Sequence, residues 1–344
     1  MLLPGPRLRR WLLPWLLAVA ALANLAYPMY VHYDFSHSLD TRSYLRMASG
    51  RFDSVNVTRR YRVLVPGAAA AVAAPIARIY ARIWPQRPPG QWPLRFAFYL
   101  VNCLLLGAAG ACWFNAARQA GAAPMAAALA MLAVLSSRWA EYAAGLPLTD
   151  SLYLLVFGLG YYAVRRGSGG GWTLGLALLL GPLAKESFVF LVPWLLWFGR
   201  PALAWSRQAV ALAGGLAMLF IVHYSIDNQL GLPTGQSVSN ALSHLDNLAY
   251  SLRRAASPKG LGELLSIFGL FTLIPPLALV LQRRMAVPPS IFSTLGSADI
   301  GFVVVVVVHM LLSGDLGRMG YLAAPAFCVL LALVFTHWQR LLRA

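Results

Sequence analysis

Charged side chains are concentrated in two stretches that follow the first hydrophobic segment of the chain. The first reads HSLDTRSYLRMASG, residues 37–50, and the second reads RRYRVLVPG, residues 59–67. Together they place an acid, several arginines and a tyrosine directly outside an apolar segment. Charge at the edge of a bilayer costs free energy unless it is solvated, paired or bound to a charged ligand. The pattern therefore predicts chemistry at a membrane surface.

Ionisable residues in later connections between apolar runs are expected on the same side of the membrane. Arginines at that depth can bind anionic head groups or lipid-linked phosphates. The candidates for one outer site are Asp40, Arg60, Arg62, Asp150, Lys185, Glu186, Asp315 and Arg318. The six histidines show no metal-ligand spacing, and the three cysteines all lie inside apolar runs. The sequence therefore favours neither a metal site nor a disulfide framework.

The composition is that of a membrane protein with many helical spans. Hydrophobic residues make up 59% of the 344, charged residues only 11%, and the mean hydropathy is +0.64. Soluble domains carry about 25% charged residues. The net charge of +17 does not indicate nucleic-acid binding: much of the arginine lies in short loops, where it is an orientation signal, and the rest could meet anionic lipid head groups or lipid-linked phosphates. We expect an all-α polytopic protein with one integral membrane domain over residues 1–344 and no separate soluble domain.

The apolar runs predict about ten transmembrane helices with both termini in the cytoplasm. Three arginines precede the first run; a cleaved signal peptide ending near residue 23 is the less favoured alternative. Alternation from a cytoplasmic start makes every short cytoplasmic loop basic, as the positive-inside rule requires. The expected spans lie near residues 11–30, 93–113, 123–136, 149–164, 172–184, 188–199, 208–223, 264–282, 299–313 and 320–337.

Two further segments are predicted to lie at the outer surface. Counting residues 63–79 as a span would reverse the side of every later loop. Pro66 and Pro75 also favour a broken helix, so we expect this segment at the outer interface. Apolar residues at helical spacing over residues 238–252 predict an amphipathic outer helix.

Four short motifs resemble a known group of membrane enzymes. LDTRSYLRMASG, YRVLVPG, LTDSLYLL at the start of a helix, and LAKESFVFLVP are similar to segments of the polytopic GT-C-type glycosyltransferases of bacterial envelopes. GDLGRMGYLAAPAF is similar to a late segment in uncharacterised relatives of that group. The resemblance covers about residues 30–200 and 313–327. It implies an enzyme of the bacterial cytoplasmic membrane that takes a sugar from a polyprenyl-phosphate carrier and passes it to a glycan, lipid or protein acceptor on the outer face.

The resemblance also implies roles for the candidate residues. An acid in the first outer loop is the catalytic base of these enzymes, and Asp40 is the matching position; the paired acid often found there is absent. The other candidates are expected to bind substrate or carrier phosphate. An inverting transfer needs one carboxylate to accept the hydroxyl proton and cations to stabilise the departing phosphate. Arginine and lysine can do this for a polyprenyl monophosphate, so no metal or other cofactor is expected.

Each candidate also has a purely structural interpretation. Asp40 and Asp150 each precede a helical pattern and could serve as N-caps. Lys185 could pair with Glu186 or extend to the interface. The remaining alternatives are lipid head-group contacts for Arg60 and Arg62, and a local ion pair between Asp315 and Arg318.

A transporter or flippase for a lipid-linked envelope precursor is the competing hypothesis for function. A transporter should place ionisable residues near the middle of the membrane, next to interrupted helices. Apart from the basic inner loops, this chain has most of its polar residues on one face; His309 and Asp299 are the exceptions. The pattern favours the enzyme.

Overall fold

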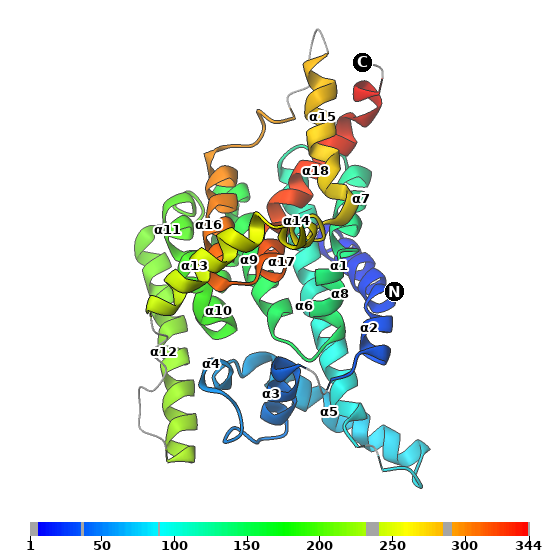
Figure 1. Cartoon of the computed structure of the whole chain (residues 1–344), viewed down its shortest axis with the longest axis vertical. Coiled ribbons are helices and arrows are strands. Elements are labelled where there is room, and N and C mark those ends of the chain that lie inside the picture. Colours follow the sequence, from blue (N-terminus) through cyan, green and yellow to red (C-terminus); the bar gives the residue numbers. More distant parts are fainter. Residues whose placement is uncertain (1–5, 36–37, 89, 232–240, 285–290, 343–344) are drawn as a thin grey trace.

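The chain folds into helices and their connections. The computed structural model describes residues 6–35, 38–88, 90–231, 241–284 and 291–342, and no strand occurs among them (Figure 1). Five of the described helical segments are long and apolar enough to cross a membrane, or six if one bent pair is counted as a single span. The five are Arg10–His32, Leu64–Ile83, Trp92–Gln119, Trp205–Leu230 and Leu316–Leu341. The described part of the chain is therefore all-α, as expected, and contains helices suited to crossing a membrane; it does not confirm ten spans.

The helices of the first half of the chain carry part of the candidate site. Its helices are α1 (Pro6–Leu25), α2 (Tyr27–His32), α3 (Leu39–Ala48), α4 (Val57–Arg60), α5 (Leu64–Ile83), α6 (Trp92–Gln119), α7 (Pro124–Leu135), α8 (Arg138–Gly145) and α9 (Asp150–Arg166). The long helix α6 packs along α1 and α9. Small residues permit this close approach: a Cβ on Gly158 of α9 would lie 3.1 Å from the indole nitrogen of Trp113 on α6.

The second half consists of shorter helices, several of them kinked or paired. They are η1 (Gly167–Gly169), α10 (Gly171–Ala184), η2 (Glu186–Phe190), α11 (Val192–Phe198), α12 (Trp205–Leu230), α13 (Ala241–Ala255), α14 (Pro258–Leu265), η3 (Gly269–Leu273), α15 (Ile274–Arg283), α16 (Ser297–Ser313), α17 (Leu316–Gly320), η4 (Tyr321–Ala323) and α18 (Ala324–Leu341). The run at 264–282 is not straight, because the α14 segment and the η3–α15 segment meet at 94°. Helix α13 confirms a helix over residues 241–252 of the segment expected to be amphipathic; residues 238–240 lie outside the described residues, and its place at the outer surface stays a prediction.

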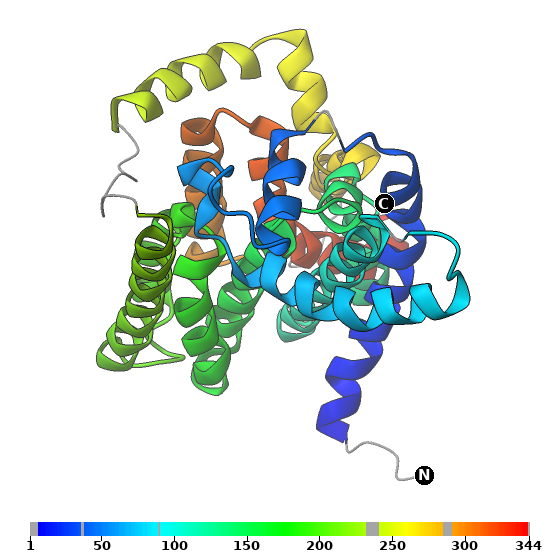
Figure 2. The ribbon, with the colours of Figure 1, turned by 90° about the horizontal axis from the view of Figure 1, so that it is seen from below.

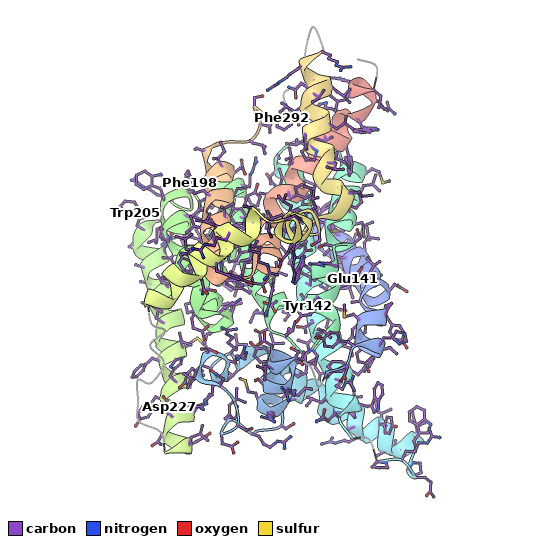
Figure 3. All side chains as sticks on the ribbon, viewed as in Figure 1. Glu141, Tyr142, Phe198, Trp205, Asp227 and Phe292 are labelled. Atoms are coloured by element: carbon purple, nitrogen blue, oxygen red, sulfur yellow. The ribbon has the colours of Figure 1, made fainter. Side chains whose placement is uncertain are left out.

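Contacts between distant helix termini divide the bundle into two ends. At one, which we call the basic end, Arg165 at the end of α9 pairs with Asp299 at the start of α16, with Nη2 2.6 Å from Oδ2. At the other, which we call the site end, the Tyr61 hydroxyl donates to Asp227 near the end of α12, at 2.7 Å. Figure 3 shows Asp227 and Trp205 at opposite ends of α12. Helices α9, α12 and α16 therefore run between the two ends.

Helix α5 differs from its expected form. It continues for 20 residues through Pro75 and does not break. Pro66 is in the first turn, where a backbone N–H has no helical acceptor, and the alanines around Pro75 are strong helix formers. The expectation of a broken helix was therefore wrong. Figure 2 views the molecule from the site end, which carries α3 and α4, and α5 lies across it.

Candidate functional site

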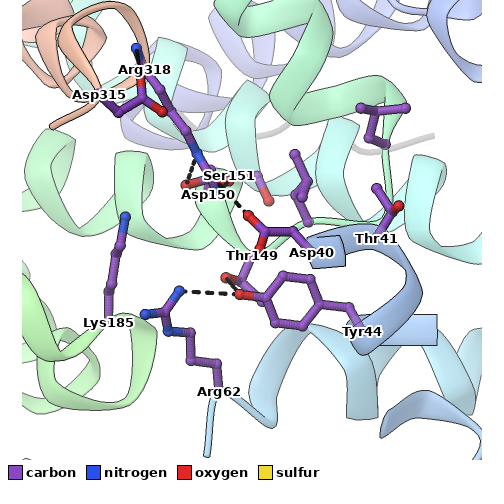
Figure 4. A network of polar contacts seen from close by, with 12 residues as sticks. Asp40, Thr41, Tyr44, Arg62, Thr149, Asp150, Ser151, Lys185, Asp315 and Arg318 are labelled. Atoms are coloured by element: carbon purple, nitrogen blue, oxygen red, sulfur yellow. Dashed lines mark hydrogen bonds and ion pairs between the residues drawn. The ribbon is translucent and has the colours of Figure 1, made fainter. Parts of the chain in front are cut away.

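Arg318 joins two acids that are far apart in the sequence. Its Nε and Nη2 donate to the two carboxylate oxygens of Asp150, at 3.1 and 2.5 Å, and its Nη1 donates to Asp40 Oδ2 at 3.0 Å (Figure 4). The Arg318 side chain is 17% exposed. A planar fork of this kind fixes the orientation of both partners. Arg318 therefore connects the start of α9 with α3.

The short helix α17 holds Arg318 in place. Gly314 ends α16 in the left-handed region, with φ of 77°, and Asp315 then caps α17 by accepting the backbone N–H of Arg318 at 3.0 Å. Gly317 lies against Trp139, since a Cβ there would be 2.2 Å from the indole ring. The structural alternative for these two residues, a local ion pair between Asp315 and Arg318, is therefore not what the structure shows. Asp315 binds the backbone, and the guanidinium is left for Asp40 and Asp150.

Asp40 is held by two arginines. Ser38, not Asp40, caps α3, accepting the Thr41 N–H at 3.4 Å. The Asp40 carboxylate instead accepts hydrogen bonds from Arg318 and from Arg59 Nε. Burial opposes ionisation of this group, but the two guanidinium charges outweigh it and lower the pKa of Asp40. The carboxylate is therefore ionised and paired at neutral pH.

Of two neighbouring arginines, the structure places Arg59 at Asp40 and the candidate Arg60 away from it. Arg60, a candidate for the site, is 7% exposed and donates from Nε and Nη2 to the carbonyl of Val55, at 3.2 and 2.9 Å. It closes its own loop, and Arg59 pairs with Asp40 in its place. Successive residues of a helical turn point about 100° apart, so only one of the two can face α3. The RRYRVLVPG motif identified the turn that contacts Asp40, but the choice between Arg59 and Arg60 depends on which of them the helix points toward α3.

Arg62 connects the first outer loop to the turn after α10. Its Nε and Nη2 donate to Glu186 Oε2 at 3.1 and 2.7 Å, and its Nη1 donates to the Tyr44 hydroxyl at 3.1 Å. Thr149 Oγ1 lies 3.3 Å from the same hydroxyl. Glu186 therefore pairs with Arg62 and not with its neighbour Lys185. Tyr44 and Thr149 were not among the candidates; both lie inside the quoted motifs, but their residue types alone gave no reason to select them.

Lys185 extends toward the Arg318–Asp150 pair without an acid in salt-bridge contact among the described residues (Figure 4). Its Nζ lies 3.5 Å from the Met319 sulfur and 5.3 Å from the centre of the Tyr153 ring. Burial and the neighbouring Arg318 charge lower the pKa of Lys185 to about 7, against the opposing effect of Asp150. This cation is therefore poorly compensated and near its titration point.

The loop that carries Arg59 and Arg62 is also fixed to α12. The Tyr61 ring stacks on His223, with ring centres 3.4 Å apart, and its hydroxyl binds Asp227. Neither Asp227 nor His223 was among the candidates for the site. Their contact with Tyr61 depends on residues more than 160 positions apart.

We call the following nine residues the site cluster: Asp40, Tyr44, Arg59, Arg62, Thr149, Asp150, Lys185, Glu186 and Arg318. It contains four cations and three carboxylates, so one positive charge is left when Lys185 is protonated. The cavity between the Arg318–Asp150 pair and Trp139 holds about 10 Å³, enough for one water molecule. Arg59 and Glu186 have the most exposed of the ion-paired side chains in the cluster, at 26% and 45%.

The described residues include no group of three or more His, Cys, Asp or Glu side chains placed to hold a metal ion. Comparison of the chain with models of known protein families, with curated proteins and with solved structures found no match. Function is therefore inferred from the sequence motifs and from the geometry of the site cluster.

Proposed function

We propose that this protein is a GT-C-type glycosyltransferase of the bacterial cytoplasmic membrane. It moves a sugar from a polyprenyl-phosphate carrier to a glycan, lipid or protein acceptor on the outer face. The observation that carries the proposal is the meeting of Arg318 with Asp40 and Asp150, next to Arg62 and Lys185. These residues come from four separate parts of the chain. They combine one partly exposed carboxylate with an excess of positive charge.

In the proposed reaction, Asp40 accepts the proton of the acceptor hydroxyl. The acceptor oxygen then forms a bond to the anomeric carbon while the bond from that carbon to the phosphate oxygen breaks. The electron pair of the broken bond stays on the polyprenyl phosphate, whose second negative charge is stabilised by Arg59, Lys185 and Arg318. General-base catalysis contributes typically 10²–10⁴-fold, and fixed cations act where charge develops.

The proposed topology has ten spans, with the site end outside and α5 at the outer interface. Its support is that the short connections at the opposite end of the bundle carry basic residues, and the positive-inside rule counts charge in short loops. Arg165 contacts Asp299 there, the carbonyl of Arg10 accepts a bond from Asn115, and the rings of Trp11 and Tyr162 lie 5.0 Å apart. The positive-inside rule assigns such an end to the cytoplasm. Both termini are then cytoplasmic.

The transporter hypothesis is less favoured because of where the buried charges lie. Asp150, Lys185, Asp299 and Arg318 all lie at or next to helix termini. A transport path would place such groups between the two ends of the bundle, whereas Asp150 and Arg318 contact Asp40 at the site end and Asp299 lies at the basic end. His309, buried within α16, is the exception among the described residues.

A direct assay tests the proposal. The purified protein is reconstituted in vesicles with a panel of polyprenyl-phosphate sugars, each radiolabelled in the sugar, and loss of label from the carrier is measured. At least one sugar should leave its carrier in an enzyme-dependent reaction. Movement of intact carrier across the vesicle membrane without release of label would favour the transporter instead.

A further inference from the structure

Asp40 cannot act as a base while both arginines hold it. A carboxylate that accepts charge-assisted hydrogen bonds from two guanidinium groups has a lowered affinity for protons. In this structure both Asp40 oxygens are engaged, Oδ1 by Arg59 and Oδ2 by Arg318. Something must compete for at least one of these arginines before Asp40 can take a proton.

The two arginines differ in how easily each can give up its hydrogen bond to Asp40. Arg318 is fixed by its fork to Asp150 and by its place on α17. Arg59 reaches Asp40 through Nε, and no described residue accepts a hydrogen bond from its two terminal nitrogens. Its side chain is also 26% exposed. Arg59 therefore has two donors in a plane, the arrangement that binds a phosphate through parallel hydrogen bonds.

We propose that Arg59 is an anion-exchange residue, which releases Asp40 in order to bind the phosphate of a lipid-linked substrate. The phosphate replaces the Asp40 carboxylate on Arg59, and Asp40 keeps only its bond to Arg318. Arg59 thus binds the carrier and also controls when the base is available. The inference rests on the proposed function and assigns Arg59, which the motifs did not select, to its substrate.

Charge balance supports the exchange. The site cluster has one uncompensated positive charge when Lys185 is protonated, and a phosphodiester carries one negative charge. Binding therefore neutralises the cluster without leaving an isolated carboxylate, because Arg318 still pairs with Asp40 and Asp150. The consequence is an order of events: the donor binds first, and only then can the acceptor lose its proton to Asp40.

Competition between an internal acid and a ligand has a measurable signature. If Asp40 occupies Arg59 most of the time, the apparent affinity for phosphate is reduced by the fraction of Arg59 that is free. Asp40→Asn removes the competitor, so it should tighten phosphate binding by about tenfold if about one Arg59 in ten is free. If Asp40 has only a structural role, Asp40→Asn should instead weaken phosphate binding, because loss of the carboxylate would loosen the site.

The experiment measures binding of farnesyl phosphate to the full-length protein by isothermal titration calorimetry. Farnesol and inorganic phosphate are the separate arms, and they show whether the lipid or the free anion is recognised. The variants are Asp40→Asn, Arg59→Gln and the double variant. Asp53→Asn and Arg42→Gln are matched controls, because both residues are exposed and each makes the same charge change in the same loop region. The double variant removes a neutral pair, so it remains informative if Asp40→Asn alone fails to fold.

The exchange predicts tighter binding in Asp40→Asn, about tenfold weaker binding in Arg59→Gln, and no gain from Asp40→Asn once Arg59 is Gln. The two controls should change affinity less than twofold. Unchanged or weaker binding in Asp40→Asn, or equal effects of Asp40→Asn with and without Arg59, would overturn it. If sugar is transferred but the effects of Asp40→Asn and Arg59→Gln are not coupled, the glycosyltransferase proposal holds and the exchange proposal fails. If binding is coupled but no sugar is transferred, the exchange proposal holds and the glycosyltransferase proposal fails.

Discussion

Arg318 is the residue on which the geometry of the site depends. It binds Asp150 through two nitrogens and Asp40 through a third. A lysine at this position would keep the charge, but it could not form a planar fork. Hydrogen bonds to charged groups contribute about 1.5–3 kcal/mol each, so losing one corresponds to about a tenfold to hundredfold effect.

Arg318→Lys should therefore raise the KM for the donor by at least about tenfold, with a smaller change in protein yield. Steady-state transfer assays measure this, with Arg42→Lys as the control on an exposed arginine of α3. Normal kinetics in Arg318→Lys would mean that charge alone is sufficient there.

Lys185 should make donor binding depend on pH. Its pKa is lowered to about 7, so the ammonium is present below that pH and is lost above it. The donor is a phosphodiester whose charge is constant in this range. Its KM should rise by about tenfold per pH unit above 7, because a growing fraction of the protein must first take up a proton. Lys185→Arg should flatten the profile, since arginine stays charged. A flat wild-type profile between pH 6 and 9 would contradict a contact between Lys185 and phosphate.

At the residue scale, the sequence motifs identified most of the charged residues of the site but not all of the contacts between them. Asp40, Arg62, Asp150, Lys185 and Arg318 were selected because ionisable residues in the short connections between apolar runs stand out. The choice between Arg59 and Arg60 depends on helix phase. The backbone role of Asp315 depends on where α17 begins. Neither can be obtained from residue type, because the deciding contacts are set by local backbone geometry.

At the element scale, α17 is positioned by the close packing of Gly317 against Trp139. A Cβ at Gly317 would lie 2.2 Å from the ring, and a tryptophan has little freedom to move aside. Gly317→Ala should destabilise the protein by about 1–3 kcal/mol, as overpacking does, and should raise the KM for the donor by displacing Arg318. Thermal unfolding and transfer assays provide the measurement.

Gly262→Ala on α14 is the matched control, since nothing lies within 4 Å of a Cβ there. It should be neutral or slightly stabilising, because alanine restricts the unfolded chain. Equal behaviour of the two variants would show that the Trp139 contact does not position α17.

The helices themselves were largely predictable, and their interruptions were not. Hydropathy identified the apolar runs because a helix in lipid must satisfy its own backbone hydrogen bonds. Pro75 did not break α5, whereas the chain bends by 94° between α14 and α15. Proline is a local signal that neighbouring alanines can outweigh. At the bend, Gly269 has a φ of 56°, and α15 beyond it packs against α18.

At the scale of the whole molecule, the two ends of the bundle should face opposite sides of the membrane. The native cysteines Cys103, Cys112 and Cys328 are buried, so they should react little with a maleimide. Labelling then reports on the single introduced cysteine. Asp53→Cys at the site end should react with an impermeant maleimide from outside intact cells. Ser168→Cys at the basic end should react only after the membrane is opened. Labelling of both from the same side would contradict the topology.

The central claim is that one carboxylate at the site end performs the proton transfer. Asp40→Asn keeps the size of the side chain but cannot accept the proton. The most direct measurement is the turnover of reconstituted wild-type, Asp40→Asn and Asp53→Asn protein with a radiolabelled polyprenyl-phosphate sugar at saturating concentration. The account predicts a loss of about two to four orders of magnitude in Asp40→Asn alone, the usual contribution of a general base. Turnover within a few-fold of wild type in Asp40→Asn would contradict it.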